Sequence, residues 1–172
     1  MLPPMTSVSS WVVAWAGLVP QDATVLDVAA GRGRHTGFFA GRGHAVTAVD
    51  RDPSPISGYS EFDIEVVRAD LENGPWPLAG RKFGAVVVTN YLHRPLFPIL
   101  LDSLSAGGVL IYETFMQGNE RLGKPSNPDF LLKDGELLEL VRGRFSVTAY
   151  EARMISEPRM AMVQRIAARK LS

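Results

Sequence analysis

The stretch "VLDVAAGRGRHTGFFAGRGHAVTAVD", residues 25–50, decides the fold of this chain. It contains two short apolar runs, within 23–29 and 45–50, each typical of a buried strand. Between them, residues 33–43 predict a short helix whose Phe38 and Phe39 face the sheet. A strand, a helix and a strand in this order predict a parallel pair joined by a helical crossover.

The same alternation continues on both sides of this stretch. Further strands are predicted at 64–70, 83–90 and 107–115, and helices at 10–18, 95–104 and 134–143. Asp134 is the predicted cap of the last helix and Gly143 its stop. Residues 145–153 and 159–169 form a strand pair joined around "ISEPR". We therefore expect a single α/β domain over residues 1–172, with a doubly wound, mostly parallel seven-stranded sheet and an antiparallel last strand.

Composition excludes several classes of protein. With 46% apolar and 21% charged residues, the 172-residue chain is neither disordered nor fibrous. It has no cysteine, and its three histidines are too few and too scattered for a zinc site, so no metal is expected. The formal net charge is zero and no basic cluster carries interleaved aromatics, so no nucleic-acid partner is expected.

The apolar stretch 11–19 is too short to span a bilayer, which takes roughly 20 residues. A signal peptide has a basic start, whereas the first basic residue here is Arg32. We expect a cytoplasmic monomer or homodimer with no membrane partner.

Two glycine-rich turns resemble each other, "AGRGRH" at 30–35 and "AGRGH" at 40–44. The first follows a strand and precedes a helix, where backbone N–H groups converge on a ligand. The second follows that helix, and Gly41 or Gly43 can supply the left-handed conformation that ends it. The first turn is therefore the predicted ligand cradle, and the second a helix end.

The residues around the cradle indicate its ligand. "GRGRHT" has Thr36 where a dinucleotide fingerprint has its third glycine, and no P-loop is present. Asp27 ends the preceding strand, and its carboxylate opposes a pyrophosphate but suits a cationic amine. A dinucleotide-binding oxidoreductase is therefore disfavoured.

"VLDVAAGRG" resembles motif I of the class I S-adenosylmethionine-dependent methyltransferases, acid-x-Gly-x-Gly-x-Gly, with Ala29 in the place of the first glycine. The longer stretch 25–53 resembles a subgroup similar to the tellurite-resistance-type small-molecule methyltransferases. The resemblance implies a Rossmann-like fold and methyl transfer from S-adenosylmethionine to a small acceptor. Because alanine disfavours positive φ, we expect the backbone of Ala29 to avoid it.

The resemblance also implies roles for single residues. Asp50 would take the ribose hydroxyls, Asp70 the adenine amino group, and Arg34 (or Arg32) the methionine carboxylate, with Asn90 near the transferring methyl. Asp50 and Asp70 as turn acids, and a solvent-exposed Arg34, stay open as alternatives. The implied cofactor-binding set is Asp27, Ala29, Ala30, Gly31, Gly33, Arg34, Asp50, Arg51, Asp70, Leu71 and Asn90.

The acceptor side is less defined. Tyr91, His93 and Glu113 are the candidate catalytic residues, because an O–H or N–H acceptor benefits from a base. The segment 115–135 is rich in glycine, proline and asparagine. Together with the N-terminal helix, it is predicted to wall the acceptor pocket, with Glu113 and three further polar candidates, Asn119, Arg121 and Lys124. A solvated connection is the alternative for this segment, and a non-catalytic cofactor- or partner-binding module is the alternative function.

Overall fold

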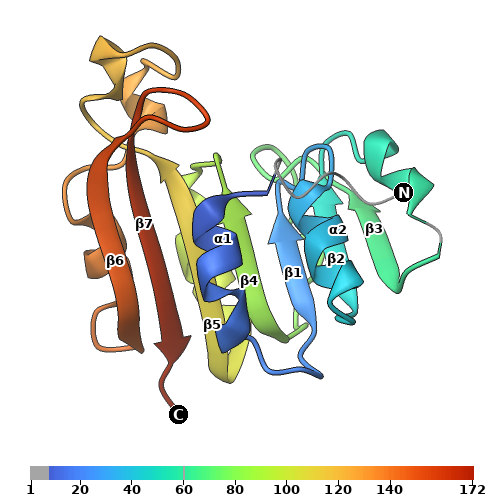
Figure 1. Ribbon diagram of the computed structural model, residues 1–172. Helices are drawn as coiled ribbons and strands as arrows, with labels where there is room; N and C mark the ends of the chain where they lie inside the picture. The colour runs from blue at the N-terminus through green and yellow to red at the C-terminus, as the bar shows by residue number, and fades with distance from the viewer. Residues whose placement is uncertain (1–7, 60) are drawn as a thin grey trace.

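The computed structural model describes residues 8–59 and 61–172. Its seven strands form one sheet in the order β3-β2-β1-β4-β5-β7-β6 (Figure 1). Strand β7 is antiparallel to β5 and β6, whereas the other pairs are parallel. The strands are β1 Val25–Val28, β2 Val46–Asp50, β3 Ile64–Arg68, β4 Phe83–Thr89, β5 Leu104–Phe115, β6 Phe145–Ile155 and β7 Ala161–Lys170. The predicted fold class is confirmed, including the antiparallel last strand.

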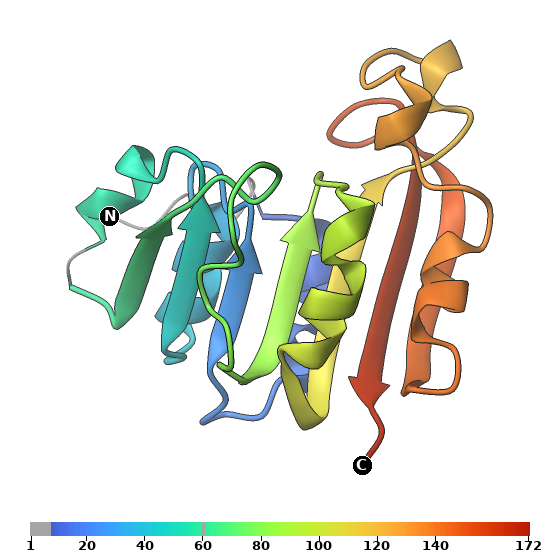
Figure 2. The ribbon, with the colours of Figure 1, turned by 180° about the vertical axis from the view of Figure 1, so that it is seen from behind.

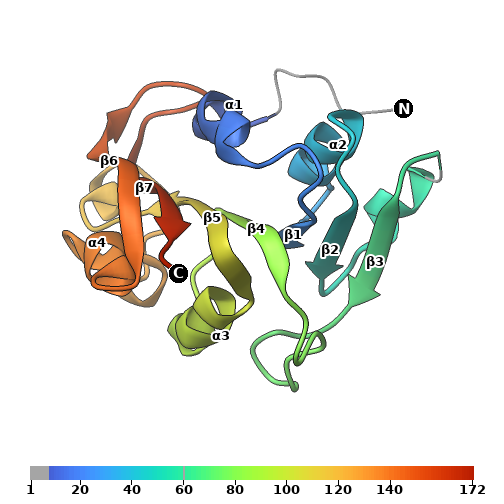
Figure 3. The ribbon, with the colours of Figure 1, turned by 90° about the horizontal axis from the view of Figure 1, so that it is seen from below.

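Helices cover both faces of the sheet. α1 (Ser10–Trp15) and α2 (Arg34–Gly41) lie on one face, and α3 (Phe97–Asp102) and α4 (Glu136–Val141) lie on the other, which Figures 2 and 3 show from behind and from below. The structure also has short 3₁₀ helices: η2 Ala16–Leu18, η3 Ser54–Gly58, η4 Arg94–Leu96, η5 Asn119–Arg121 and η6 Pro128–Phe130. Within the described ranges, no helix has the length and apolarity that a bilayer crossing needs.

The core has a layer on each face of the sheet. On the α1–α2 face, Phe38 and Phe39 are buried as predicted, against a cluster that includes Val87 and Ile111. On the α3–α4 face, a larger cluster contains the buried Tyr112. Strand β4 is buried along almost its whole length, because it lies mid-sheet with helices on both sides.

Several predicted helix ends differ from the structure. Asp134 does not cap α4; the cap position is Gly135, at φ 71° and without a side-chain hydrogen bond, so the predicted cap was wrong. The left-handed Gly135 turns the chain sharply into the helix, so Asp134 lies one residue before the cap position. Gly143 follows α4 at φ 74°, as a helix stop should. The predicted helix 95–104 begins as the 3₁₀ turn η4 and is α-helical only from Phe97.

Candidate functional site

The turn after β1 is held in an unusual backbone conformation. Ala29, Gly31 and Gly33 all have positive φ, at 54°, 58° and 81°. The N–H of Ala30 donates to the carbonyl of Val49 at 3.0 Å, and the N–H of Gly33 donates to that of Ala30 at 2.9 Å. The expectation that Ala29 avoids positive φ was wrong, because these bonds hold the turn in a conformation that alanine adopts only at a cost.

The second glycine-rich turn ends a helix, as predicted. Gly43 takes φ 96° two residues after the end of α2, whereas Gly41 is the last helical residue and is not left-handed. Nδ1 of His44 then donates to the carbonyl of Ala23 at 2.8 Å. This turn therefore brings the chain back into β2, and at the far end of that strand lies Asp50.

Asp50 joins the cradle to the end of β2. Its Oδ2 accepts from the N–H of Gly31 at 2.8 Å, and its Oδ1 accepts from the N–H of Asp52 at 2.8 Å. Each carboxylate oxygen has a second lone pair, so the group can still accept from a ligand. The acid thus lies against the predicted cradle and is fixed in orientation by it.

Asp70 organises the turn after β3. Its carboxylate accepts from the N–H groups of Glu72 and Asn73, at 3.0 and 3.1 Å, and from Nδ2 of Asn73 at 3.2 Å. These hydrogen bonds, that of the Asn73 side chain first, lower its pKa below the usual value. Asp70 therefore stabilises this turn, and Oδ2 keeps room for a further donor.

Three cavities follow one another along the carboxyl edge of the parallel strands. We name them A, B and C, with volumes of about 200, 290 and 400 Å³. Cavity A is lined by Ala29, Asp50, Arg51, Ala69, Asp70, Leu71, Glu72 and Tyr91. Cavity B is lined by Glu72, Asn90, Tyr91, Leu92, Thr114, Phe115, Pro125 and Phe130. The residues that line cavity C include Ser9, Arg34, Asn90, Glu113, Phe115, Glu157, Arg159 and Arg165.

Neighbouring cavities share walls. Glu72 and Tyr91 line both A and B, and Asn90 and Phe115 line both B and C. Five residues of the implied cofactor-binding set meet in cavity A, and Arg34 and Asn90 meet in cavity C. These seven residues therefore lie along one arc at the ligand-binding edge of the sheet, whereas Asp27, Ala30, Gly31 and Gly33 line none of the three cavities.

Two titratable side chains lie buried next to this arc. Asp27 is 1% exposed, lines none of the three cavities, and accepts from Thr36 Oγ1 at 2.7 Å. Burial raises its pKa to about 7, although the bonds from Thr36 oppose this. His35 accepts from the N–H of Ser9 at its Nε2, at 3.1 Å, so its proton lies on Nδ1 and faces Thr89 Oγ1. Burial lowers the pKa of His35 to about 3, so it is neutral.

A buried ion pair forms part of the wall of cavity C. Glu113 Oε2 lies 2.5 Å from Nε of Arg165, and both side chains are only 10% exposed. The two atoms are close but poorly aligned, so neither counts as hydrogen-bonded. Glu113 Oε1 accepts from Ser9 Oγ at 2.8 Å, and Arg165 also contacts Glu151 at 3.3 Å. Glu113 is therefore held between α1 and β7.

The chain resembles a known protein family and several solved structures. Residues 26–95 match a family model described as a methyltransferase domain. TehB from Haemophilus influenzae superposes with a TM-score of 0.79 at 18% identity, covering 96% of this chain and 63% of that protein. The chain has the methyltransferase fold. A search of curated proteins finds no match.

Other structures with the methyltransferase fold give the same result. The 1,6-didemethyltoxoflavin-N1-methyltransferase of Burkholderia thailandensis, solved with bound 1,6-didemethyltoxoflavin and S-adenosylhomocysteine, has a TM-score of 0.70 at 20% identity, covering 94% of this chain and 77% of that one. An S-adenosylmethionine-dependent methyltransferase from Mesorhizobium loti has a TM-score of 0.72 at 16% identity, with coverages of 96% and 100%. At these identities the likeness establishes the fold alone.

The candidate catalytic residues do not meet at one point of the methyltransferase fold. Tyr91 lines cavities A and B, and its burial, with Glu72 and Asp70 nearby, raises its pKa to about 12. Tyr91 therefore keeps its proton at neutral pH and does not act as a base at that pH. His93 precedes η4 and lines none of the three cavities. Glu113 faces cavity C but is engaged by Arg165.

The prediction for the 115–135 segment was partly wrong. Asn119 is buried and structural: its Nδ2 donates to the carbonyl of Pro125, and its Oδ1 accepts from the N–H of Met162. Arg121 lines a different hollow, whereas Lys124 lines one that adjoins cavity B through Pro125 and Phe130. The segment gives cavity B its Pro125 and Phe130, while the start of α1 walls cavity C.

The opposite wall of cavity C comes from residues that sequence reasoning missed. They belong to the end of β6, the β6–β7 turn and β7: Ile155, Glu157, Pro158, Arg159, Ala161, Val163 and Arg165. The sequence predicts this turn only as a connection between two strands. The turn reaches the carboxyl edge because β7 inserts antiparallel beside β5, and no local sequence pattern indicates that pairing.

Proposed function

We propose that this chain transfers a methyl group from S-adenosylmethionine to a small acceptor. The observation that carries the proposal is the arc of cavities A, B and C, which begins at the cradle beside Asp50 and passes Asn90. The family match over residues 26–95 supports it. So do two neighbours of the same fold that bind S-adenosylhomocysteine, the toxoflavin-precursor enzyme and the glycopeptide N-methyltransferase MtfA.

The residues present fit the cofactor. Cavity A offers carboxylate oxygens of Asp50 and Asp70 to donors such as ribose hydroxyls and an adenine amino group. It contains Arg51 but no glycine-rich loop of the P-loop type, so a nucleoside is a better match than a polyphosphate. Arg34 begins α2, where the helix dipole favours an anionic group such as a carboxylate.

Alignment is the main task of this protein. When bound, the cofactor supplies a methyl group already activated on a sulfonium, so catalysis needs an acceptor held in line with it. Asn90, whose backbone is left-handed at φ 54°, lines both B and C and marks the place where acceptor and cofactor meet. The protonated Tyr91 can orient a polar group on either side of this point.

A non-catalytic binding module is the second candidate function. Two observations favour it. Glu113 is paired with Arg165, and His93 lies outside the three cavities, so neither residue offers a base to a ligand bound there. A cytoplasmic location, a monomer or homodimer, the absence of a nucleic-acid partner and the tellurite-resistance-type subgroup stay predictions from the sequence.

The proposal is tested by calorimetric titration of Asp50→Ala with S-adenosylhomocysteine. Loss of a charge-assisted hydrogen bond should weaken binding by about 1–3 kcal/mol. Asp52→Ala is the matched control, since this neighbouring acid is exposed and lines none of cavities A, B and C. Equal affinities of the Asp50 variant and the parent protein would remove Asp50 from the site.

A further inference from the structure

Phe130 is an exposed aromatic residue with a fixed position. Its side chain is 49% exposed, although it belongs to the short turn η6. It lines cavity B together with two other aromatic residues, Tyr91 and Phe115. Keeping a large apolar ring in water is unfavourable, so a ring held at the rim of a cavity indicates a binding surface.

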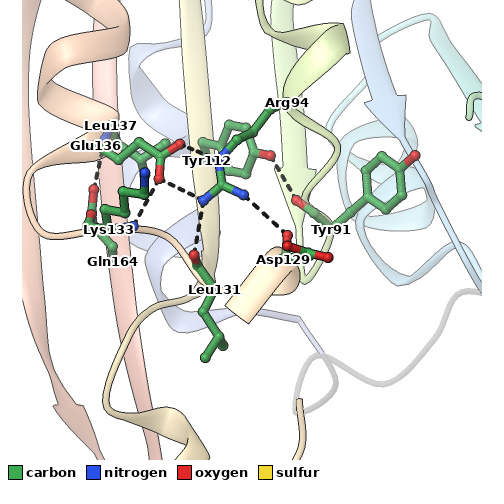
Figure 4. Close-up of polar contacts among 9 residues, drawn as sticks. All are labelled: Tyr91, Arg94, Tyr112, Asp129, Leu131, Lys133, Glu136, Leu137 and Gln164. Carbon is green, nitrogen blue, oxygen red and sulfur yellow. Dashed lines mark hydrogen bonds and ion pairs between the residues drawn. The ribbon is translucent and has the colours of Figure 1, made fainter. Parts of the chain in front are cut away.

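Arg94 fixes the backbone on both sides of Phe130. Its Nη1 donates to the carbonyl of Asp129 at 3.2 Å, and its Nη2 donates to the carbonyl of Leu131 at 3.0 Å (Figure 4). The same guanidinium binds both carboxylate oxygens of Glu136, at 2.7 and 2.9 Å. A planar guanidinium with four bonds in one network is a rigid clamp.

The opposite wall of cavity B is tied to the same clamp. Tyr91 lies three residues before Arg94, and its carbonyl accepts from the hydroxyl of Tyr112 on β5 at 2.7 Å (Figure 4). Glu136 in turn accepts from the N–H of Lys133 at 2.8 Å. The walls that carry Tyr91 and Phe130 are therefore held at a set spacing through Arg94.

Cavities B and C differ in the charged side chains that line them. Among the described residues that line B there is no lysine or arginine, and the ionisable side chains are those of Glu72 and Tyr91. Lys124 and Arg159 line the hollow that adjoins B at Pro125 and Phe130. Cavity C, in contrast, contains Arg34, Arg159 and Arg165 and suits an anionic group. A volume of about 290 Å³ lies at the lower end of ligand pockets and matches one or two fused rings.

We propose that cavity B binds the acceptor, that the acceptor is a planar aromatic compound without negative charge, and that Arg94 is a positioning residue for this slot. Aromatic rings prefer offset or edge-on contact with other aromatic rings, which Tyr91, Phe115 and Phe130 provide. Cavity B adjoins Asn90, so a ring there lies next to the proposed methyl position. This inference rests on the proposed function, because it assigns the acceptor to a part of the same arc.

The test uses 2-naphthol and its fully saturated analogue decahydro-2-naphthol as probes. Their binding is measured by saturation-transfer NMR, with and without saturating S-adenosylhomocysteine. The unmodified protein should bind 2-naphthol at least about fivefold more tightly than the saturated analogue, and Phe130→Ala should weaken 2-naphthol by about tenfold. Leu122→Ala is the matched control, because Leu122 is 37% exposed on the same segment but lines a different hollow. It should bind as the parent does.

Arg94→Lys separates positioning from general stability. Lysine keeps the charge but loses the bidentate contact and the carbonyl bonds. We expect it to weaken 2-naphthol as Phe130→Ala does, while the affinity for S-adenosylhomocysteine stays within twofold of the parent. Arg144→Lys, which alters the surface ion pair with Asp102, is the control and should change neither affinity.

Two results would overturn the inference. One is equal binding of 2-naphthol and its saturated analogue to the parent protein. The other is unweakened binding of 2-naphthol by Phe130→Ala, which would place the ring outside cavity B. Absence of S-adenosylhomocysteine binding would instead contradict the proposed function. The probe measurements without that ligand still test whether cavity B binds an aromatic ring.

Discussion

Replacement of Asp27 by asparagine should change how the stability of the protein depends on pH. In the folded protein, burial raises the pKa of Asp27 from 3.8 to about 7. The folded state therefore holds a proton that the unfolded chain releases, so this group contributes stability below about pH 4 and loses it as the pH rises to 7. Asparagine keeps an oxygen to accept from Thr36 but cannot ionise.

The size of the effect follows from that rise in pKa. Each unit of pKa is worth about 1.4 kcal/mol, so ionisation of Asp27 costs the folded state roughly 3 kcal/mol between pH 4.5 and 7.5. His35 acts in the opposite direction, because its folded-state pKa of about 3 lies below the usual 6.5 and its contribution is lost as the pH falls. In the parent protein the two slopes oppose each other between about pH 4 and 6.5.

The assay is urea unfolding of the parent and of Asp27→Asn at steps from pH 4.5 to 7.5. The free energy of unfolding of the variant should rise relative to the parent by roughly 3 kcal/mol across this range. Asp22→Asn, which removes an exposed carboxylate, is the control and should give a nearly constant difference. A constant difference for Asp27→Asn as well would refute the buried, proton-holding state of this carboxyl.

Four further variants, at three positions, test the packing of the site by urea unfolding. Ala29→Gly should stabilise the protein by less than about 1 kcal/mol, because glycine tolerates the φ of 54°. Ala29→Val should destabilise it by about 2 kcal/mol, because this φ is worse for a β-branched residue. Unchanged stability of the valine variant would contradict the left-handed conformation of residue 29. Gly33→Ala should cost about 2 kcal/mol, because its Cβ would lie 2.9 Å from Cγ1 of Ile56 at φ 81°, and unchanged stability would show that the cradle can relax. Glu113→Gln should cost about 2 kcal/mol by leaving the buried Arg165 with only its longer contact to Glu151, and a neutral outcome would show that the pair does not hold α1 to β7.

The positions of the strands along the chain are largely determined by local sequence patterns. Short apolar runs that end in an acid or small residue gave β1, β2 and β4 within a residue or two. Because parallel strands end at one edge, the same pattern also brought Asp50, Asp70 and Asn90 to one arc. These residues were found because their position depends only on where their own strand stops.

Features that depend on contacts between distant segments were missed. The positive φ of Ala29 is imposed by bonds from neighbouring elements, including that of Ala30 to Val49 in β2. The engagement of Glu113 needs Arg165, which is 52 positions away and reaches it only because β7 inserts beside β5. The clamp between Arg94 and Glu136 spans 42 positions in the same way. None of these pairings has a periodic or local signature in the sequence.

The central claim is that the arc beginning at Asp50 binds an adenosyl ligand. Calorimetric titration of the unmodified protein with S-adenosylhomocysteine and, separately, with NAD tests it most directly. The account predicts saturable binding of S-adenosylhomocysteine at a single site and no saturable binding of NAD. Binding of NAD without binding of S-adenosylhomocysteine would contradict it.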